Sequence, residues 1–323
     1  MSDYFMTFPF VSIIIPVFND VEGLKTCLEA LERQIYPTDD WEIAVVDNGP
    51  DDSIKDCVAR FPRASYLVET IPTQFAARNK GIRECRGEII AFTDADCLPD
   101  AHWLREGVEE LVNTPNCGLV AGHIEVFPEI EGKANAVELF EMITALPQEE
   151  LVTKMTFGAT ANIFTFKQIF ETVGFFNLSL PSGGDLEWGR RVSRAGYQVV
   201  YAPKALVKHP ARKTWPSLRS RTIRVMGGLH QINLTSYPHR SNLNRFRGLI
   251  HDIWRDWPNL NDLLAIYKDA RIPNQSDRIK VALVTLAVKW TRISEKVRLF
   301  LGGGLKTDYN RDLQAVGIKS ENI

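Results

Sequence analysis

Short apolar runs alternate with segments of helical periodicity along the first 125 residues, and this alternation limits the fold more than any other feature. We expect strands at 11–15, 41–46, 65–68, 88–93 and 118–122. Helices are expected after Asp20, after Ser53, and at 74–85 and 103–112. Strands that alternate with helices are typical of a parallel sheet with right-handed crossovers. The pattern predicts an α/β fold, a doubly wound and mostly parallel sheet with helices on both faces.

The sequence Asp94-Ala95-Asp96 follows directly on the run 88–93. Open α/β sheets bind ligands at the carboxyl ends of their strands. Two carboxylates one residue apart offer hard oxygen ligands to a divalent cation and to the phosphates that the cation carries. A polar turn after a strand is the plainer interpretation and would be preferred if the pattern stood alone.

Further polar residues follow the other expected strands. Pro16, Phe18 and Asn19 come at the end of the first strand, and Asp47 ends the second. Phe18 could pack on a nucleotide base, and Asp47 could accept a hydrogen bond from a base or ribose. Arg78, on the expected helix 74–85, offers a fork-shaped cation to a base carbonyl or a phosphate. Each residue also has a structural alternative: Asp47 as a turn former, Asn19 as a helix cap and Arg78 in a surface ion pair. All three alternatives would have to be true at once.

Five segments jointly resemble glycosyltransferases of family 2, whose fold is named GT-A. They are 12–19, 45–49, 77–81, 92–96 and 183–191. Their order and spacing match the family over about residues 10–210. The resemblance therefore implies a catalytic domain that binds a nucleotide sugar, which we place at 8–212, and a mostly helical extension at 213–323.

The resemblance also implies roles for single residues. The nucleotide sugar would be bound by Pro16, Phe18, Asn19, Asp47, Arg78, Asp94, Ala95 and Asp96. A cofactor, Mg²⁺ or Mn²⁺, would be held by Asp94, Asp96 and His209. Asp185 matches the general base. The acceptor side would include Asn162, Gly183, Gly184, Glu187 and Trp188.

Some of these assignments carry alternatives. Gly184 stands where many relatives have Glu, and Glu187 could take over part of that residue's work. Asn162 lies in a small-residue stretch that could equally be a tight strand crossing, and Trp188 could equally be a core residue. The GT-A resemblance leaves these choices open.

The resemblance implies an inverting glycosyltransferase that moves a sugar, from UDP by preference, to a hydroxyl of a glycan or lipid-linked acceptor. The product would be an exopolysaccharide or another surface glycan. A non-catalytic nucleotide-sugar scaffold or sensor is the alternative from another class. A sugar nucleotidyltransferase would require a glycine-rich basic loop after the first strand, and residues 16–20 do not provide one.

Charge divides the chain into an acidic and a basic part. Residues 208–323 hold 21 Lys and Arg against 9 Asp and Glu, whereas residues 1–207 hold 17 against 31. A basic part suits an anionic membrane, nucleic acid or an acidic protein surface. Since no nucleic-acid motif is present, we expect no nucleic-acid partner.

One apolar stripe runs through the basic part at helical spacing. It consists of Ile279, Leu283, Leu286, Trp290, Ile293, Val297 and Phe300. Packing of this helix on the catalytic domain is the preferred interpretation. Contact of 276–301 with an anionic leaflet and a homodimer interface are the two alternatives.

Cysteines and hydropathy indicate the compartment. The five cysteines are scattered without a C-x-x-C pair, which argues against disulfides and a zinc site. We recognise no signal peptide and no apolar run of about 18 residues. We therefore expect a cytoplasmic protein, with a peripheral position at the cytoplasmic membrane face as an alternative.

Overall fold

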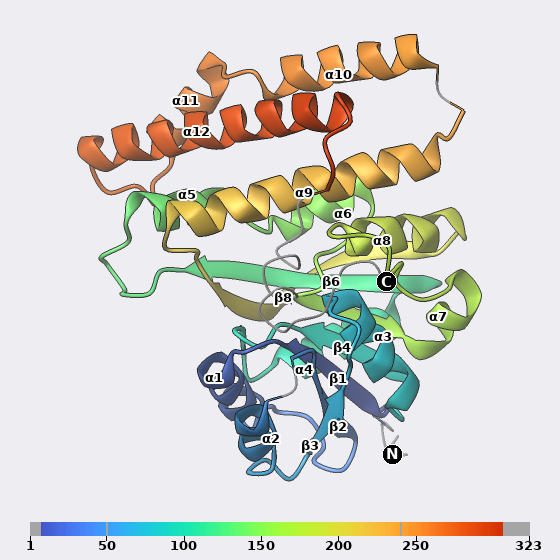
Figure 1. Cartoon of the computed structure of the whole chain (residues 1–323). Coiled ribbons are helices and arrows are strands. Elements are labelled where there is room, and N and C mark those ends of the chain that lie inside the picture. Colours follow the sequence, from blue (N-terminus) through green and yellow to red (C-terminus); the bar gives the residue numbers. More distant parts are fainter. Residues whose placement is uncertain (1–7, 50, 240, 306–323) are drawn as a thin grey trace. The chain divides into compact units, whose positions relative to one another are not determined.

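The computed structural model describes residues 8–49, 51–239 and 241–305, which form two compact units (Figure 1). The first unit holds the described residues up to 125, together with 146–178 and 185–209. The second unit holds 126–145, 179–184 and the described residues from 210 onward. The last segment of the second unit starts at 210, and its two earlier segments fall within the range 8–212 that the sequence analysis assigned to the catalytic domain. The boundary at 212 stays a prediction.

The described residues build an eight-stranded sheet in the order β3-β2-β1-β4-β7-β6-β8-β5. Its strands are β1 (Val11–Val17), β2 (Trp41–Asp47), β3 (Ala64–Val68), β4 (Ile89–Thr93), β5 (Leu98–Pro99), β6 (Cys117–Phe127), β7 (Asn162–Phe166) and β8 (Gln198–Pro210). All five strands expected from the sequence are present. The short β5 and the later β7 and β8 were not among the expected strands.

Only part of the sheet is parallel. β1 pairs in parallel with β2 and β4, and β2 pairs in parallel with β3. β7 runs antiparallel to both β4 and β6, and β5 runs antiparallel to β8. The sheet is therefore mixed rather than mostly parallel. Apolar runs do not reveal strand direction, because a strand covered on both faces is apolar in either direction.

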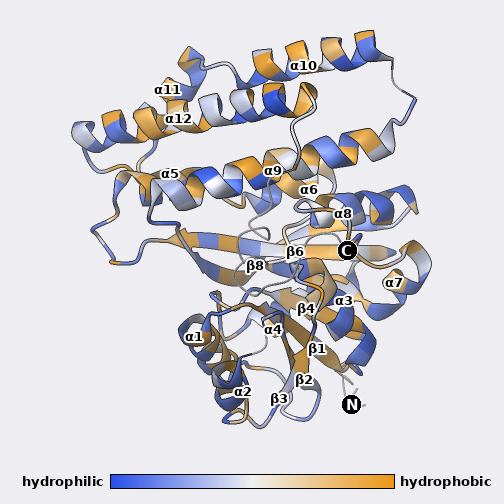
Figure 2. Cartoon of the chain, in the orientation of Figure 1, coloured by the Kyte–Doolittle hydropathy of each residue, from blue (hydrophilic) through white to orange (hydrophobic). Residues whose placement is uncertain are grey.

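Helices cover both faces of the parallel part. The strand order β3-β2-β1-β4 places the connection from β3 to β4 on the opposite face from the two preceding connections, since crossovers are right-handed. In Figure 1, α1 and α2 accordingly lie on one side of β1–β3, and α3 lies on the other. Figure 2 shows hydrophobic residues along these strands, and Ile13, Ile14 and Ile15 are fully buried.

Capping side chains set the starts of several helices. Asp20 accepts a hydrogen bond from the backbone of Gly23, and Thr73 accepts one from Ala76. Such caps satisfy N–H groups that the first helical turn leaves without partners. The helices of the first unit are α1 (Val21–Leu31), α2 (Asp52–Val58), α3 (Gln74–Glu84), α4 (Trp103–Asn113), α6 (Gln148–Met155), α7 (Lys167–Val173) and α8, which runs from Gly184 of the second unit to Arg194.

The second unit is helical. It contains α5 (Ala136–Thr144), α9 (Trp215–Ser236), α10 (Asn242–Asp256), α11 (Leu260–Lys268) and α12 (Gln275–Phe300). α12 packs against the other four helices. The core of the second unit is formed by Leu139, Phe140, Leu218, Ile266, Ile272, Val281 and Val288. The mainly helical C-terminal extension expected from the sequence is therefore present.

Among the described residues, no helix combines the length and hydropathy that crossing a bilayer requires. The five cysteines are all buried and free.

Candidate active site

Arg78 and Asp94 form the best-defined contact of the candidate site. Nη2 of Arg78, on α3, donates to Oδ1 of Asp94, just after β4, over 2.6 Å. The Arg78 side chain is 1% exposed, and its Nε and Nη1 have no hydrogen-bond partner among the described residues. Buried donors are nearly always satisfied in folded proteins. The three N–H groups on these two nitrogens are therefore donors that the described residues leave unpaired, beside the carboxylate of Asp94.

Asp94, Asp96 and His209, the predicted metal ligands, lie near one another. Nε2 of His209, on β8, is 4.0 Å from Oδ1 of Asp96. Ligand atoms of Asp94, His209 and Cys97 lie within 4.8 Å of one another. Burial raises the pKa of Asp96, and the Asp94 carboxylate raises it further, while His209 opposes both. Two crowded carboxylates beside an imidazole are a natural place for a cation.

Cys97 is a residue of this cluster that sequence reasoning missed. Its thiol is fully buried, and burial raises its pKa well above the usual value. It directly follows Asp96, so its position in the chain could have drawn attention to it. A search for C-x-x-C spacing overlooks a single cysteine that the fold brings beside a histidine 112 residues away.

Asp185 lies in the first turn of α8. One of its oxygens accepts a hydrogen bond from the backbone N–H of Leu186 over 2.9 Å. Burial raises the pKa of Asp185; the Arg78 guanidinium lowers it and the Asp94 carboxylate raises it. The general base expected from the sequence is therefore within electrostatic reach of the Arg78–Asp94 pair. The fold brings three segments together that are far apart in the sequence.

Asp47 is buried at the end of β2 and is already hydrogen-bonded within the protein. It accepts from the backbone N–H of Gly49 and Asp51 at 2.9 and 3.1 Å, and from the hydroxyl of Tyr66 at 3.0 Å. The turn-forming alternative is thus realised. These bonds use three of the roughly four acceptor positions of a carboxylate, and the Asp47 side chain is fully buried.

Tyr66 is the second residue that the sequence analysis did not identify. Burial, and then its hydrogen bond to Asp47, raise the pKa of Tyr66 to about 12. The hydroxyl therefore stays protonated and keeps donating to Asp47. Tyr66 lies on β3, and only the pairing of β3 with β2 reveals the contact.

Phe18 and Asn19 follow β1 and lie close to the Asp47 turn. The Phe18 ring lies against Gly49, where an added Cβ would come within 2.6 Å of it. Phe18 is 44% exposed and Asn19 has a left-handed φ of 51°. An exposed ring held at the rim of a sheet can stack on a base. Pro16 lies within β1 opposite Val46.

Two residues expected on the acceptor side are instead structural. Asn162 is fully buried, accepts from Nε1 of Trp103 over 2.8 Å, and donates to the carbonyls of His123 and Ala205. All its polar atoms are thus engaged in joining neighbouring segments of the fold. Asn162 therefore has no donor left for an acceptor sugar.

Trp188 is likewise a core residue. It is fully buried, stacks on Phe170 with ring centroids 4.7 Å apart, and donates from Nε1 to the carbonyl of Gly174. Stacking of Trp188 on an acceptor sugar is therefore excluded by its burial. The apolar face of α8 needs a large side chain here.

Glu187, the residue before Trp188 on α8, forms an ion pair with Arg191. Its two oxygens accept from Nε and Nη2 of Arg191 at 2.8 and 2.9 Å. This engagement leaves little freedom for the acidic role that the sequence analysis considered for it. Gly183 has a φ of 77°, a left-handed conformation that suits glycine, and Gly184 starts α8. Ala95 is nearly buried between the two aspartates.

Comparison with known proteins decides the family. The family model for glycosyl transferase family 2 matches residues 12–174. The chain belongs to glycosyl transferase family 2. It is 37% identical over 231 residues to the glycosyltransferase AglE of Haloferax volcanii, a match that covers 70% of this chain and 75% of AglE. The protein is therefore a glycosyltransferase enzyme.

Two further comparisons concern more distant proteins. One is a glucuronosyltransferase of Methanococcus voltae whose name specifies dolichyl N-acetyl-alpha-D-glucosaminyl phosphate. It is 22% identical to this chain over 227 residues, which cover 66% of this chain and 71% of the Methanococcus protein. The other is the structure of the mannosyltransferase PcManGT from Pyrobaculum calidifontis in complex with GDP-Man and Mn²⁺. It shares 17% identity, with a TM-score of 0.55 over 97% of this chain and 80% of its own. This likeness shows that this glycosyltransferase has the GT-A fold.

The donor set of the glycosyltransferase fits a divalent cation. Asp94 and Asp96 offer carboxylate oxygens, which suit Mn²⁺ or Mg²⁺, and His209 offers an imidazole nitrogen 4.0 Å from Asp96. The thiol of Cys97 also lies within 4.8 Å of the ligand atoms of Asp94 and His209. The negative charge of the two carboxylates also favours a cation there. Nε and Nη1 of Arg78 remain the unpaired donors nearest to these carboxylates among the residues described for this site.

Proposed function

We propose that this glycosyltransferase moves a sugar from a nucleotide-diphosphate sugar, UDP-sugar by preference, to a hydroxyl of a glycan or lipid-linked acceptor. The observation that carries the proposal is the Arg78 guanidinium. It is 99% buried, bound on one side to Asp94, and has two nitrogens, Nε and Nη1, without a partner among the described residues. A diphosphate is a dianionic ligand that would satisfy both.

Asp185 is the proposed base. The acceptor oxygen would attack the anomeric carbon while the bond from that carbon to the diphosphate oxygen breaks. The hydroxyl proton would pass to the Asp185 carboxylate, and the electron pair of the broken bond would leave with the diphosphate. A single displacement of this kind inverts the configuration at the anomeric carbon.

Arg78 would neutralise charge that develops on the leaving diphosphate. Its fixed position, held by Asp94, means that little reorganisation is required during the reaction. A divalent cation held by Asp94, Asp96 and His209 would add charge neutralisation when bound. Mn²⁺ is favoured because PcManGT was solved with Mn²⁺.

Support for a lipid-linked acceptor comes from a relative. The name of the Methanococcus voltae transferase specifies a dolichyl phosphate sugar. A glycan without a lipid remains the other arm of the proposal.

Calorimetric titration tests the donor. The purified protein would be titrated with UDP, GDP and dTDP, each with and without Mn²⁺. We expect metal-dependent binding of UDP, lost in Asp96→Asn and retained in the control Glu171→Gln, an exposed acid on α7. Binding of GDP alone would change the donor, and binding of none of them by folded protein would contradict the proposed site.

Turnover separates an enzyme from a nucleotide-sugar scaffold. Release of the nucleoside diphosphate from the donor would be followed with the preferred nucleotide sugar and candidate acceptors. We expect Asp185→Asn to bind the nucleotide normally and to release almost no product. Normal turnover by this variant would refute the assigned base.

A further inference from the structure

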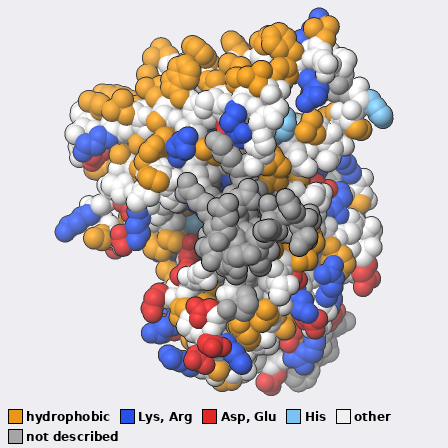
Figure 3. All heavy atoms as spheres, viewed as in Figure 1, with side chains coloured by type: hydrophobic (Ala, Val, Ile, Leu, Met, Phe, Trp, Pro, Cys, Tyr) orange, Lys and Arg blue, Asp and Glu red, His pale blue; other side chains and the backbone are white. Residues whose placement is uncertain are grey.

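Helices α10, α11 and α12 carry large apolar side chains that face solvent, and we name this set the apolar face. Its members have exposed fractions between 40% and 78%. They are Leu243, Phe246, Ile250 and Trp254 on α10, Trp257 after it, Leu260, Leu263, Leu264 and Tyr267 on α11, and Ile279, Leu283 and Trp290 on α12. Figure 3 shows hydrophobic side chains gathered along these helices, and Figure 2 shows the corresponding apolar stripes.

The apolar face follows helical periodicity. On α10, its members recur every three or four residues, which places them along one side of the helix. On α12, Ile279, Leu283 and Trp290 of the predicted stripe are exposed, whereas Val281 and Leu299 are buried. The second unit thus builds its core from the other side of α12. The exposed part of the stripe is left for a partner.

The apolar face is continuous across the helices. The rings of Trp257 and Trp290 meet edge to face, with centroids 5.6 Å apart. Monomeric proteins rarely expose apolar patches larger than about 300–600 Å² without a function. A face built from three helices and carrying three tryptophans requires such an explanation.

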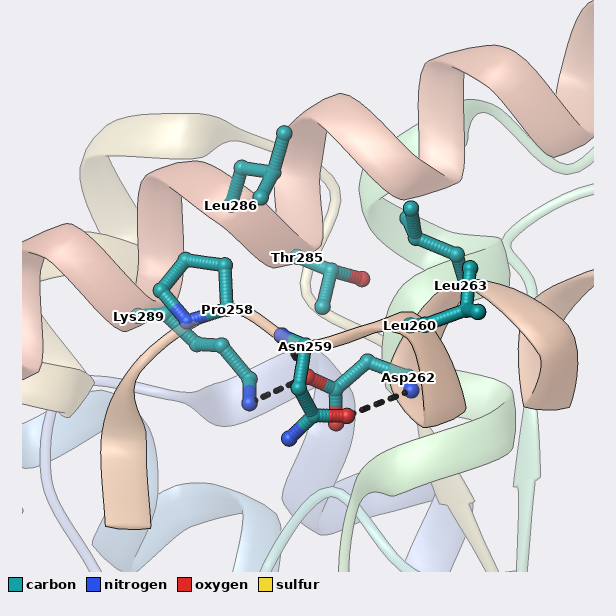
Figure 4. A pocket seen from close by; sticks show the side chains of 8 residues that line it. All are labelled: Pro258, Asn259, Leu260, Asp262, Leu263, Thr285, Leu286 and Lys289. Atoms are coloured by element: carbon teal, nitrogen blue, oxygen red, sulfur yellow. Dashed lines mark hydrogen bonds and ion pairs between the residues drawn. The ribbon is translucent and has the colours of Figure 1, made fainter. Parts of the chain in front are cut away.

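A recess lies within the same surface, between the start of α11 and α12 (Figure 4). Its volume is about 240 Å³. It is lined by Pro258, Asn259, Leu260, Asp262, Leu263, Thr285, Leu286 and Lys289. An ion pair of 2.5 Å between Lys289 and Asp262 anchors α11 to α12 there. The recess adds apolar surface that a flexible chain could fill.

The segment that carries the apolar face has unequal charges. Residues 242–301 contain eleven Lys and Arg and six Asp and Glu. Every one of these six acids lies in an ion pair with a cation of the same segment. The pairs are Asp252–Arg255, Asp256–Arg292 and Asp256–Lys296, Asp262–Lys289, Asp269–Arg271, Asp277–Lys280 and Glu295–Arg298. The segment therefore presents an excess of positive charge.

We propose that the apolar face docks on a lipid bilayer that contains anionic lipids. Amphipathic helices bury their apolar side in the interfacial region, and tryptophan and tyrosine favour that depth. The excess of cations is attracted to anionic headgroups. A second copy of this chain would bring the same positive excess to the contact, so charge repulsion disfavours self-association.

The docked state goes beyond the proposed function, because it depends on neither the donor nor the base. It also extends the surface considered from the sequence. That surface was limited to 276–301. Of the exposed side chains named above, four lie on α10, four lie on α11, and Trp257 follows directly on α10. The tertiary arrangement joins three amphipathic segments into one surface.

Co-sedimentation with vesicles tests the proposal. The full chain would be mixed with vesicles of phosphatidylcholine alone and of phosphatidylcholine with about 30% phosphatidylglycerol. We expect binding to the anionic vesicles, weaker at high salt, and little binding to the neutral ones. Trp254→Glu should reduce the bound fraction about tenfold, and the double variant Ile250→Glu/Trp254→Glu should abolish binding.

The matched control is Val112→Glu, which replaces an exposed apolar residue on α4 in the first unit. It should bind vesicles like the unchanged protein. Thermal unfolding and nucleotide titration of every variant would show that folding and the donor site are retained. Equal vesicle binding by the Trp254 variants, or none by the unchanged chain, would overturn the proposal. So would a dimer in sedimentation velocity that Trp254→Glu dissociates.

Discussion

Arg78 is held by Asp94 through a 2.6 Å hydrogen bond from Nη2 to Oδ1, and the rest of its buried guanidinium has no partner among the described residues. The contact joins a helix that precedes β4 to the first aspartate that follows it. The hydrogen bond fixes the orientation of the guanidinium plane. A mobile arginine would lose conformational freedom when it binds a ligand, whereas Arg78 has already lost it. The cation is thereby prepared for an anionic ligand.

Arg78→Lys should weaken nucleoside diphosphate binding. Lysine keeps the charge but loses the planar fork, and a hydrogen bond to a charged group contributes about 1.5–3 kcal/mol. We expect the dissociation constant to rise about 10- to 100-fold in calorimetry. Arg83→Lys, at an exposed position on the same helix, is the control. An unchanged constant in Arg78→Lys would mean that the diphosphate binds elsewhere.

The pH dependence of transfer should report Asp185. Burial raises the pKa of Asp185, and the base works only when deprotonated. Activity should therefore fall as the pH decreases through this raised value, at a higher pH than for an exposed aspartate, whose pKa is about 3.9. The measurement is the chemical rate against pH. An acid limb at or below the ordinary value would contradict the assignment.

Asp185→Asn should also stabilise the folded protein at neutral pH. The pKa of Asp185 is higher in the folded chain than in the unfolded chain, so the folded chain keeps the carboxyl proton to a higher pH. The free energy of unfolding therefore falls as the pH rises from the unfolded to the folded pKa of Asp185. Removing the desolvated charge removes this cost. We expect a higher Tm at pH 7 in thermal unfolding, with Glu171→Gln unchanged. A lower Tm would show that the carboxylate stabilises the fold.

The metal ligands can be told apart by two substitutions. Asp96→Asn should weaken Mn²⁺-dependent nucleotide binding by at least about tenfold, because the amide carries no charge. Cys97→Ser should change it less than about twofold, since Mn²⁺ prefers oxygen and imidazole to a thiol. Equal losses in the two variants would place the Cys97 thiol in the coordination shell instead.

Trp188→Ala should act on stability. Deleting a buried tryptophan side chain costs about 3–5 kcal/mol, and Trp188→Phe should cost less because a ring remains against Phe170. Urea unfolding measures both, with the acceptor KM determined on the folded variants. A normal free energy of unfolding with a raised acceptor KM would return Trp188 to the acceptor side.

The sequence by itself determined the local order of the fold. Apolar runs and capping residues such as Asp20 and Thr73 specified the first strands and helices, since burial and the satisfaction of helix ends are local properties. Aspartates placed directly after strands also marked the rim where Asp47, Asp94 and Asp96 were expected, whereas Asp185 was expected from the family resemblance.

Only the tertiary structure decided which of these residues are available for chemistry. Asn162 and Trp188 carry suitable groups, but pairing across the fold buries them and uses their polar atoms. Strand direction beyond β4, the Tyr66 contact to Asp47 and the place of Cys97 depend on neighbours far away in the sequence. The same holds for the exposed stripe of α12, because a hydrophobic period shows that a side is apolar and does not show what covers it.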